Sequence, residues 1–329
     1  MKMDFLRAGA ETLGLNLTAE HLRTFYRYWQ ELSEWNERVN LTTVTDCEGV
    51  QVRHFLDSLL PLAALRTVGW PPLDRKAKPS SEEGRGGPFL CADVGSGAGF
   101  PGVPLKIVCP SWSLVLVESV GKKAQFLRHL VQALCLQGVS VEQARAEDLG
   151  RKPGHREQYD LVVARAVADL RVLGEYTLPL VRRGGILAAH KGARAEREVW
   201  EAEEALNLLG GKVVRILSYE LPGLVEPRRI VLVEKVATTP PQYPRRPGIP
   251  QKRPLGTPGR ERFRALSENL PRVQNRREVP RYPLFSTVLQ AGGMPDRGLL
   301  SARARASCTR FTRALTRAVS SRPSKGTFR

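Results

Sequence analysis

One glycine-rich stretch, residues 92–104, separates an apolar run from a helical pattern and reads Ala92-Asp93-Val94-Gly95-Ser96-Gly97-Ala98-Gly99-Phe100-Pro101-Gly102-Val103-Pro104. Glycines permit a tight turn and let a ligand approach the backbone. A proline at 101 or 104 suits a first helical turn, where a missing N–H costs little. The stretch therefore predicts a strand, a ligand-binding glycine loop and a helix, in that order.

On both sides of this loop, short runs rich in Val and Leu alternate with helical patterns such as 122–136. The predicted strands are Phe89–Val94, Leu114–Glu118, Val139–Gln143, Tyr159–Ala164, Ile186–His190, Lys212–Glu220 and Arg228–Lys235. Strand–helix–strand alternation is typical of a parallel sheet covered by helices. The last connection is too short for a helix, so we expect the last two strands to be antiparallel.

The N-terminal region, residues 1–70, is predicted to be a helical extension. Apolar residues recur every three or four positions over His21–Val39, with Thr18 as a plausible N-cap, and a second helix is expected over about Cys47–Leu65. His54 and Asp57 lie three apart on that second helix, where either a contact with the functional site or a structural pair is possible. Residues 71–88 lack apolar periodicity and predict a solvated loop.

The net charge of +18 is concentrated at the C-terminal end. Residues 240–329 hold 18 Arg and 2 Lys against 4 acidic residues, and seven prolines fall between Pro240 and Pro258. We therefore expect a core over 89–237 followed by a disordered basic tail over 238–329. Three interpretations of the tail stay open: phosphate contacts with RNA, an extension without a role, or misassigned coding sequence.

Composition excludes several classes of protein. The sequence contains no run of about 18 apolar residues, so no membrane span is predicted. The five cysteines form no Cys-x-x-Cys pair, which favours a reducing cytoplasm over a disulfide scaffold or a zinc site. The five histidines show no metal-ligand spacing, so no metal site is expected.

The ligand of the glycine loop is ambiguous from the loop alone. Gly97 to Gly102 matches the dinucleotide pattern G-x-G-x-x-G, and Glu118 after the next strand would hold a ribose diol in a dinucleotide or an adenosyl cofactor. Asp93 before the loop, the acid pair Glu147-Asp148 placed to read an adenine edge, and the closing antiparallel hairpin favour S-adenosyl-L-methionine. A nicotinamide-dependent oxidoreductase and a non-catalytic RNA-binding protein are the alternatives.

Several ordered blocks give the sequence a family resemblance. They are Trp35-Asn36, Asn40-Leu41-Thr42, Arg53-His54-Phe55-Leu56-Asp57-Ser58, the glycine stretch, Arg145-Ala146-Glu147, Arg165-Ala166, His190-Lys191-Gly192 and Pro227-Arg228-Arg229-Ile230-Val231. The sequence resembles the bacterial small-subunit (16S) ribosomal RNA (guanine-N7) methyltransferases, the glucose-inhibited division protein B family. The resemblance implies a Rossmann-like class I S-adenosylmethionine-dependent methyltransferase fold, with a mostly parallel seven-stranded sheet.

The resemblance also implies roles for individual residues. The cofactor-binding set is Gly95, Gly97, Gly99, Phe100, Glu118, Ala146, Glu147 and Arg165, and the basic residues that face RNA are Arg145, Lys191 and Arg228. The expected partner is 16S ribosomal RNA or the small ribosomal subunit. Two departures are visible: a longer loop at 71–88 and an apparent insertion at 150–158.

Guanine N7 carries a lone pair and no hydrogen, so its methylation needs alignment and electrostatics rather than a general base. The sequence agrees, because no base dyad stands out. The fourth strand is followed by Ala164-Arg165-Ala166-Val167 rather than Asn-Pro-Pro-Tyr, which disfavours methylation of an adenine amine. A Pro-Cys nucleophile block for carbon-5 pyrimidine methylation is also absent.

Overall fold

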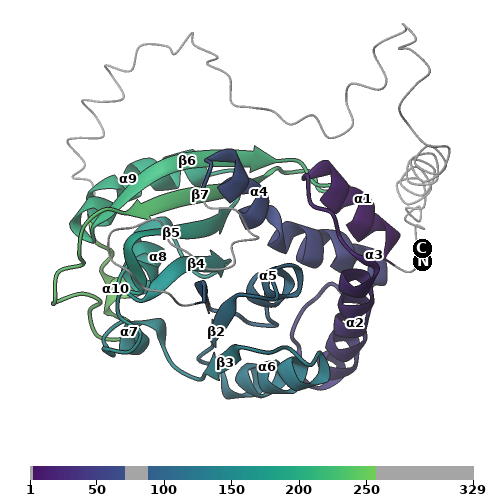
Figure 1. The fold of residues 1–329 in the computed structure, drawn as a ribbon. Helices are drawn as coiled ribbons and strands as arrows, with labels where there is room; N and C mark the ends of the chain where they lie inside the picture. The colour runs from purple at the N-terminus through teal and green to yellow at the C-terminus, as the bar shows by residue number, and fades with distance from the viewer. Residues whose placement is uncertain (1–2, 71–87, 257–329) are drawn as a thin grey trace, which may run out of the picture.

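The protein folds around one seven-stranded sheet in a computed structural model that describes residues 3–70 and 88–256 (Figure 1). The strands are β1 (Leu90–Val94), β2 (Ser113–Val117), β3 (Val139–Glu142), β4 (Tyr159–Arg165), β5 (Val181–Lys191), β6 (Gly211–Tyr219) and β7 (Arg228–Lys235). Their order in the sheet is β3-β2-β1-β4-β5-β7-β6. Strands β1 to β5 pair in parallel, whereas β7 pairs antiparallel to both β5 and β6. The predicted fold class and closing hairpin are confirmed.

Alternating side chains of the strands feed two hydrophobic cores, one on each face of the sheet. Cys91 of β1 and Leu161 of β4 belong to the core that also contains α5 (Gly102–Val108), α6 (Gly121–Ala133) and the N-terminal helices. Ala92 and Val162, their neighbours in sequence, belong to the core under α7 (Ala146–Leu149), α8 (Leu170–Thr177) and α9 (Ala195–Leu208). Both faces are buried, as a parallel sheet requires.

Four helical segments precede the sheet within residues 3–70. They are α1 (Asp4–Thr12), α2 (Ala19–Val39), α3 (Cys47–Val50), which continues as a π-helical turn η1 (Gln51–Leu56), and α4 (Leu60–Thr67). Thr18 caps α2 as predicted, accepting a hydrogen bond from the His21 N–H. The single helix predicted over Cys47–Leu65 is wrong: the π turn interrupts it, and Pro61 in the first turn of α4 has no N–H to continue the ladder. Such turns are frequent at functional sites, and this one carries His54.

The chain stays packed after β7, which corrects the predicted start of the tail at residue 238. Residues 238–256 lie against α7 and α8 and include the short helix α10 (Ile249–Lys252) (Figure 1). Tyr243 and Leu255 pack onto the core beneath α7–α9. Proline-rich composition predicted the lack of helix and strand, but it does not exclude packing through anchored side chains. Residues 257–329 of the predicted tail and nearly all of the predicted loop lie outside the described residues. No helix in the described ranges is long and apolar enough to cross a membrane.

Candidate functional site

The glycine loop turns sharply at the carboxyl end of β1. Gly95, Gly97 and Gly99 have φ angles of 73°, 58° and 96°, a region that residues with a Cβ rarely adopt. The Gly97 N–H donates to Glu118 Oε2 (2.9 Å), and the Val120 N–H donates to Glu118 Oε1 (2.7 Å). The loop and the carboxylate after β2 are therefore held together at one edge of the sheet.

The glycine loop packs against the N-terminal helices. The Tyr28 hydroxyl of α2 donates to the Ala98 carbonyl (2.5 Å), and the Tyr28 ring stacks on Phe100 with centroids 5.3 Å apart. A Cβ at Gly99 would lie 2.6 Å from the Tyr28 hydroxyl oxygen, so only glycine permits this approach. Sequence reasoning missed Tyr28, because a tyrosine on an apolar helix is indistinguishable from core packing.

Asp93 anchors the other end of the loop. Its Oδ2 accepts a hydrogen bond from the Gly102 N–H (2.9 Å) at the start of α5, and the side chain is fully buried. Burial raises the pKa of Asp93 to about 7. The buried carboxyl group thus connects the beginning of the glycine loop to the start of α5.

The two residues predicted to bracket an adenine lie at the start of α7. Ala146 and Glu147 are buried, and Glu147 Oε1 accepts a hydrogen bond from the Gly248 N–H (3.1 Å). Arg145 immediately precedes them and is exposed. Because the Glu118 N–H bonds to the Glu142 carbonyl (3.1 Å), the ends of β2 and β3 lie side by side, and α7 follows β3 at the same edge of the sheet as the glycine loop.

These residues fit an adenosyl cofactor. A Cβ placed on Gly97 would meet only the Gly95 carbonyl oxygen, at 3.9 Å, so the space beside the loop is open to a ligand. Glu118 presents a carboxylate, which suits the two hydroxyls of a ribose. Ligands of open parallel sheets bind at this carboxyl edge of the strands.

A cavity of about 850 Å³ opens beside the loop, at the carboxyl ends of β4 and β5. Its lining is rich in titratable and charged side chains: Arg53, His54, Asp57, Arg165, Asp169, His190, Lys191, Arg194, Arg197, Glu198, Glu201 and Arg228. The volume lies in the range of small-molecule sites. The structure thus brings Arg165, Lys191 and Arg228 to one cavity, whereas Arg145 lies outside its lining.

Asp57 holds two of these arginines together. Arg165 Nη1 donates to Asp57 Oδ2 (2.8 Å), and Arg228 Nε lies 3.3 Å from Asp57 Oδ1. The second contact is an ion pair without hydrogen-bond geometry. The Arg165 guanidinium also lies 4.9 Å from the centroid of the Phe100 ring, a cation–π contact. Asp57 therefore links the glycine loop to the start of β7.

His54 packs onto the same ring. Its imidazole stacks on Phe100 with centroids 4.7 Å apart, and its Nε2 lies 2.7 Å from the Thr42 hydroxyl. Burial, assisted by the charge of Arg165, lowers the pKa of His54 to about 4. His54 and Asp57 thus both line the cavity, and His54 is uncharged at neutral pH.

Lys191 points inward. Its Nζ donates to the Ala168 carbonyl (2.6 Å) and lies 2.7 Å from Glu198 Oε2, with only 6% of the side chain exposed. Arg53 and Arg194, in contrast, are exposed and form no side-chain hydrogen bond or ion pair with residues of the described ranges. Sequence reasoning gave these two arginines no binding role, since only the fold shows that they flank one cavity.

Residues 76–225 match the family described as "rRNA small subunit methyltransferase G". The protein of that name from Roseiflexus sp. (strain RS-1) is 48% identical over 253 residues, which are 77% of this chain and 100% of the relative. That from Pelotomaculum thermopropionicum is 45% identical over 250 residues, 76% of this chain and 97% of the relative. The chain belongs to the rRNA small subunit methyltransferase G family. The resemblance stated from the motifs is confirmed.

Solved structures similar to this family member are more distant. The T. thermophilus 16S rRNA N2 G1207 methyltransferase in complex with AdoMet and guanosine is 23% identical, with a TM-score of 0.34, covering 51% of this chain and 39% of that one. Among the described residues, no cluster of His, Cys, Asp and Glu could hold a metal ion.

Proposed function

We propose that the protein transfers the methyl group of S-adenosyl-L-methionine to N7 of a guanine in small-subunit (16S) ribosomal RNA. The observation that carries this function is family membership, with 48% identity over the whole length of a relative named ribosomal RNA small subunit methyltransferase G. The two alternatives, an oxidoreductase and a non-catalytic RNA-binding protein, are not favoured. The enzyme acts where small ribosomal subunits are found, in the cytoplasm.

When bound, S-adenosyl-L-methionine supplies an electrophilic methyl group. Glu118 would accept hydrogen bonds from the ribose hydroxyls, since its carboxylate is fixed by the N–H groups of Gly97 and Val120. Ala146 and Glu147 would bracket the adenine. The glycines leave the backbone of the loop accessible to the rest of the cofactor.

The cavity beside the loop suits the target guanine. Arg165 and Arg228 supply donors of the kind that bind guanine O6 or phosphate oxygens. A base is not required, because N7 carries no proton. Two titratable side chains of the cavity are already engaged: His54 is hydrogen-bonded and stacked, and Asp57 is paired with two arginines. The chemistry then depends on alignment of N7 with the methyl carbon and sulfur.

The test is methylation of small-subunit RNA with labelled S-adenosyl-L-methionine. A 7-methylguanosine makes the RNA chain sensitive to borohydride reduction followed by aniline cleavage, so we expect one new cleavage site after incubation. Gly95→Asp is the inactive control, because a Cβ there would lie 2.7 Å from Val167 and the residue has φ 73°. Label incorporated without a cleavage site would place the methyl group on another atom, and binding of NAD without transfer would favour the oxidoreductase.

A further inference from the structure

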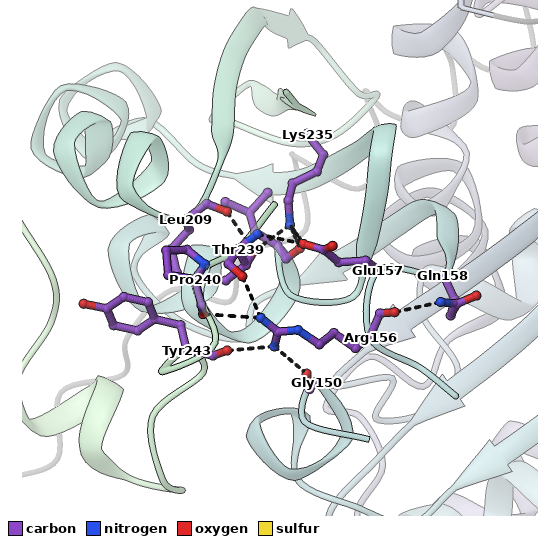
Figure 2. Close-up of polar contacts among 10 residues, drawn as sticks. Gly150, Arg156, Glu157, Gln158, Leu209, Lys235, Thr239, Pro240 and Tyr243 are labelled. Atoms are coloured by element: carbon purple, nitrogen blue, oxygen red, sulfur yellow. Dashed lines mark hydrogen bonds and ion pairs between the residues drawn. The ribbon is translucent and has the colours of Figure 1, made fainter. Parts of the chain in front are cut away.

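Residues 238–256 form a packed segment after β7, here named the C-terminal strap. It has little regular structure of its own, so its backbone polar groups need partners from other parts of the chain. Arg156 provides several of them: its guanidinium donates to the carbonyls of Thr239 (2.8 Å), Pro240 (3.3 Å) and Tyr243 (2.8 Å) (Figure 2). Arg156 lies in the apparent insertion at 150–158, so the insertion and the strap form one unit.

A buried polar cluster fixes the beginning of the strap (Figure 2). The Thr239 N–H donates to Glu157 Oε1 (2.7 Å), and the Thr239 hydroxyl donates to the Leu209 carbonyl (2.8 Å). Lys235 Nζ, fully buried, lies 3.0 Å from Glu157 Oε1 and donates to Thr239 Oγ1 (2.6 Å). These contacts tie the strap to β7 and to the segment before β4.

The middle of the strap is bound to α8. Glu175 is completely buried, and one residue of the strap gives its carboxylate three donors: the Arg245 backbone N–H (2.7 Å), Nε (2.9 Å) and Nη2 (2.6 Å). A buried carboxylate is strongly destabilising without such a partner. Arg245 therefore determines where the strap crosses α8.

Three residues further along, the strap reaches α7. The Gly248 N–H donates to Glu147 Oε1 (3.1 Å), and within the described ranges no other group donates to this carboxylate. Gly248 has φ 82°, a conformation that favours glycine. Glu147, 3% exposed, is the residue next to Ala146 at the predicted adenine end of the cofactor site.

We infer that the C-terminal strap is a positioning element of the cofactor site. By binding α8 through Arg245 and Glu147 through Gly248, it fixes α7 at the adenine end and increases the affinity for the adenosyl cofactor. This inference rests on the proposed function. Its physical basis is pre-organisation: a site whose supporting residues are already ordered loses less conformational entropy when its ligand binds.

The test is a double-mutant cycle, with the dissociation constant (Kd) for S-adenosylhomocysteine measured by calorimetry on the full chain. Arg245→Ala and Glu147→Ala should each raise Kd about tenfold, the effect of about one lost hydrogen bond. The double variant should bind S-adenosylhomocysteine no more weakly than the weaker-binding single variant, because Arg245 is inferred to influence the cofactor site only through the Gly248–Glu147 contact. In methylation assays the Arg245→Ala loss should appear in KM for S-adenosyl-L-methionine rather than in kcat, with partial rescue by Arg245→Lys.

Arg246→Ala is the matched control. Arg246 is the adjacent arginine of the strap, but its side chain is exposed and forms no hydrogen bond or ion pair with a described residue. Wild-type Kd in a folded Arg245→Ala protein, or additive losses in the double variant, would overturn the positioning role. A wild-type protein that binds no S-adenosylhomocysteine would instead overturn the proposed function.

A second measurement needs no variant, in case Arg245→Ala does not fold. Coupling between two sites is reciprocal, so a strap that favours cofactor binding must itself be stabilised by the cofactor. The amides of Arg245 and Gly248, both hydrogen-bonded to carboxylates, should exchange with deuterium about tenfold more slowly when the wild-type protein is saturated with S-adenosylhomocysteine. Unchanged exchange at both amides would contradict the inference.

Discussion

At the scale of single residues, Tyr28 joins the N-terminal helices to the glycine loop through one hydroxyl group. Burial raises the pKa of Tyr28 well above its ordinary value, so the hydroxyl stays protonated and donates to the Ala98 carbonyl. The same ring supports Phe100, on which Arg165 and His54 also rest. One residue of α2 thus contributes both a hydrogen bond and a surface to the loop.

Tyr28→Phe should therefore weaken cofactor binding. The variant keeps the ring but leaves the buried Ala98 carbonyl without its donor, which costs about 1–2 kcal/mol. We expect Kd for S-adenosylhomocysteine to rise about tenfold in calorimetry. Tyr159→Phe is the control: it also removes the hydroxyl of a buried tyrosine, one that contacts His155 (2.6 Å) away from the loop. Equal Kd values for the two variants would argue against a role of Tyr28 in the loop.

At the scale of elements, Glu198 of α9 contacts the ends of two other secondary-structure elements. It pairs with Lys191 at the end of β5 (2.7 Å) and accepts a hydrogen bond from the Leu170 N–H at the start of α8 (3.2 Å). Lys191 also donates to the Ala168 carbonyl in the segment after β4. The contacts of Lys191 are thus internal, whereas Arg194, three residues later, projects into solvent beside the cavity.

Lys191→Met should therefore lower the stability of the fold, whereas Arg194→Ala should alter RNA binding. Removing Lys191 leaves Glu198 without its cation, which should lower the free energy of unfolding by about 2 kcal/mol in denaturant titrations with little change in RNA binding. Removing Arg194 should leave stability unchanged and reduce the slope of log K against log salt for RNA binding by about one. A Lys191→Met protein of normal stability with a reduced salt slope would restore Lys191 as an RNA contact.

At the scale of the whole molecule, the polycationic C-terminal region divides at residue 256. Its first part, residues 238–256, has to be considered separately from residues 257–329. Residues 238–256 pack against the core through Arg156, Glu175 and Glu147, although the same proline-rich composition predicted disorder. The Roseiflexus relative matches 253 residues of this chain over its whole length, and these are 77% of the chain. The roles of residues 238–256 and of residues 257–329 therefore have to be tested by separate deletions.

Deletion of 257–329 should leave Kd for S-adenosylhomocysteine, the yield of 7-methylguanosine and the salt slope of RNA binding unchanged. Deletion of 238–329 should weaken cofactor binding, since it also removes the strap and leaves Glu175 buried without Arg245. Calorimetry and filter binding across salt concentrations compare the two truncations. A reduced salt slope after the shorter deletion would show that residues 257–329 contact RNA phosphates.

The local sequence specified the sheet, its connections and the glycine loop. Strand and helix periodicities, the glycine turn after β1 and the short link before β7 are properties of neighbouring residues, so each could be predicted from a few positions. Family blocks led to the predictions of individual site residues. The same local signals failed at η1 and at residues 238–256, where packing with distant parts of the chain determines the conformation.

Contacts between residues far apart in the chain were determined only by the tertiary structure. Asp57 meets Arg165 across 108 positions, and Gly248 meets Glu147 across 101. The inward direction of Lys191 likewise depends on α9 lying over the end of β5. A charged side chain gives no local sign of which opposite charge will face it, because burial and pairing are settled only when the sheet and its helices have packed.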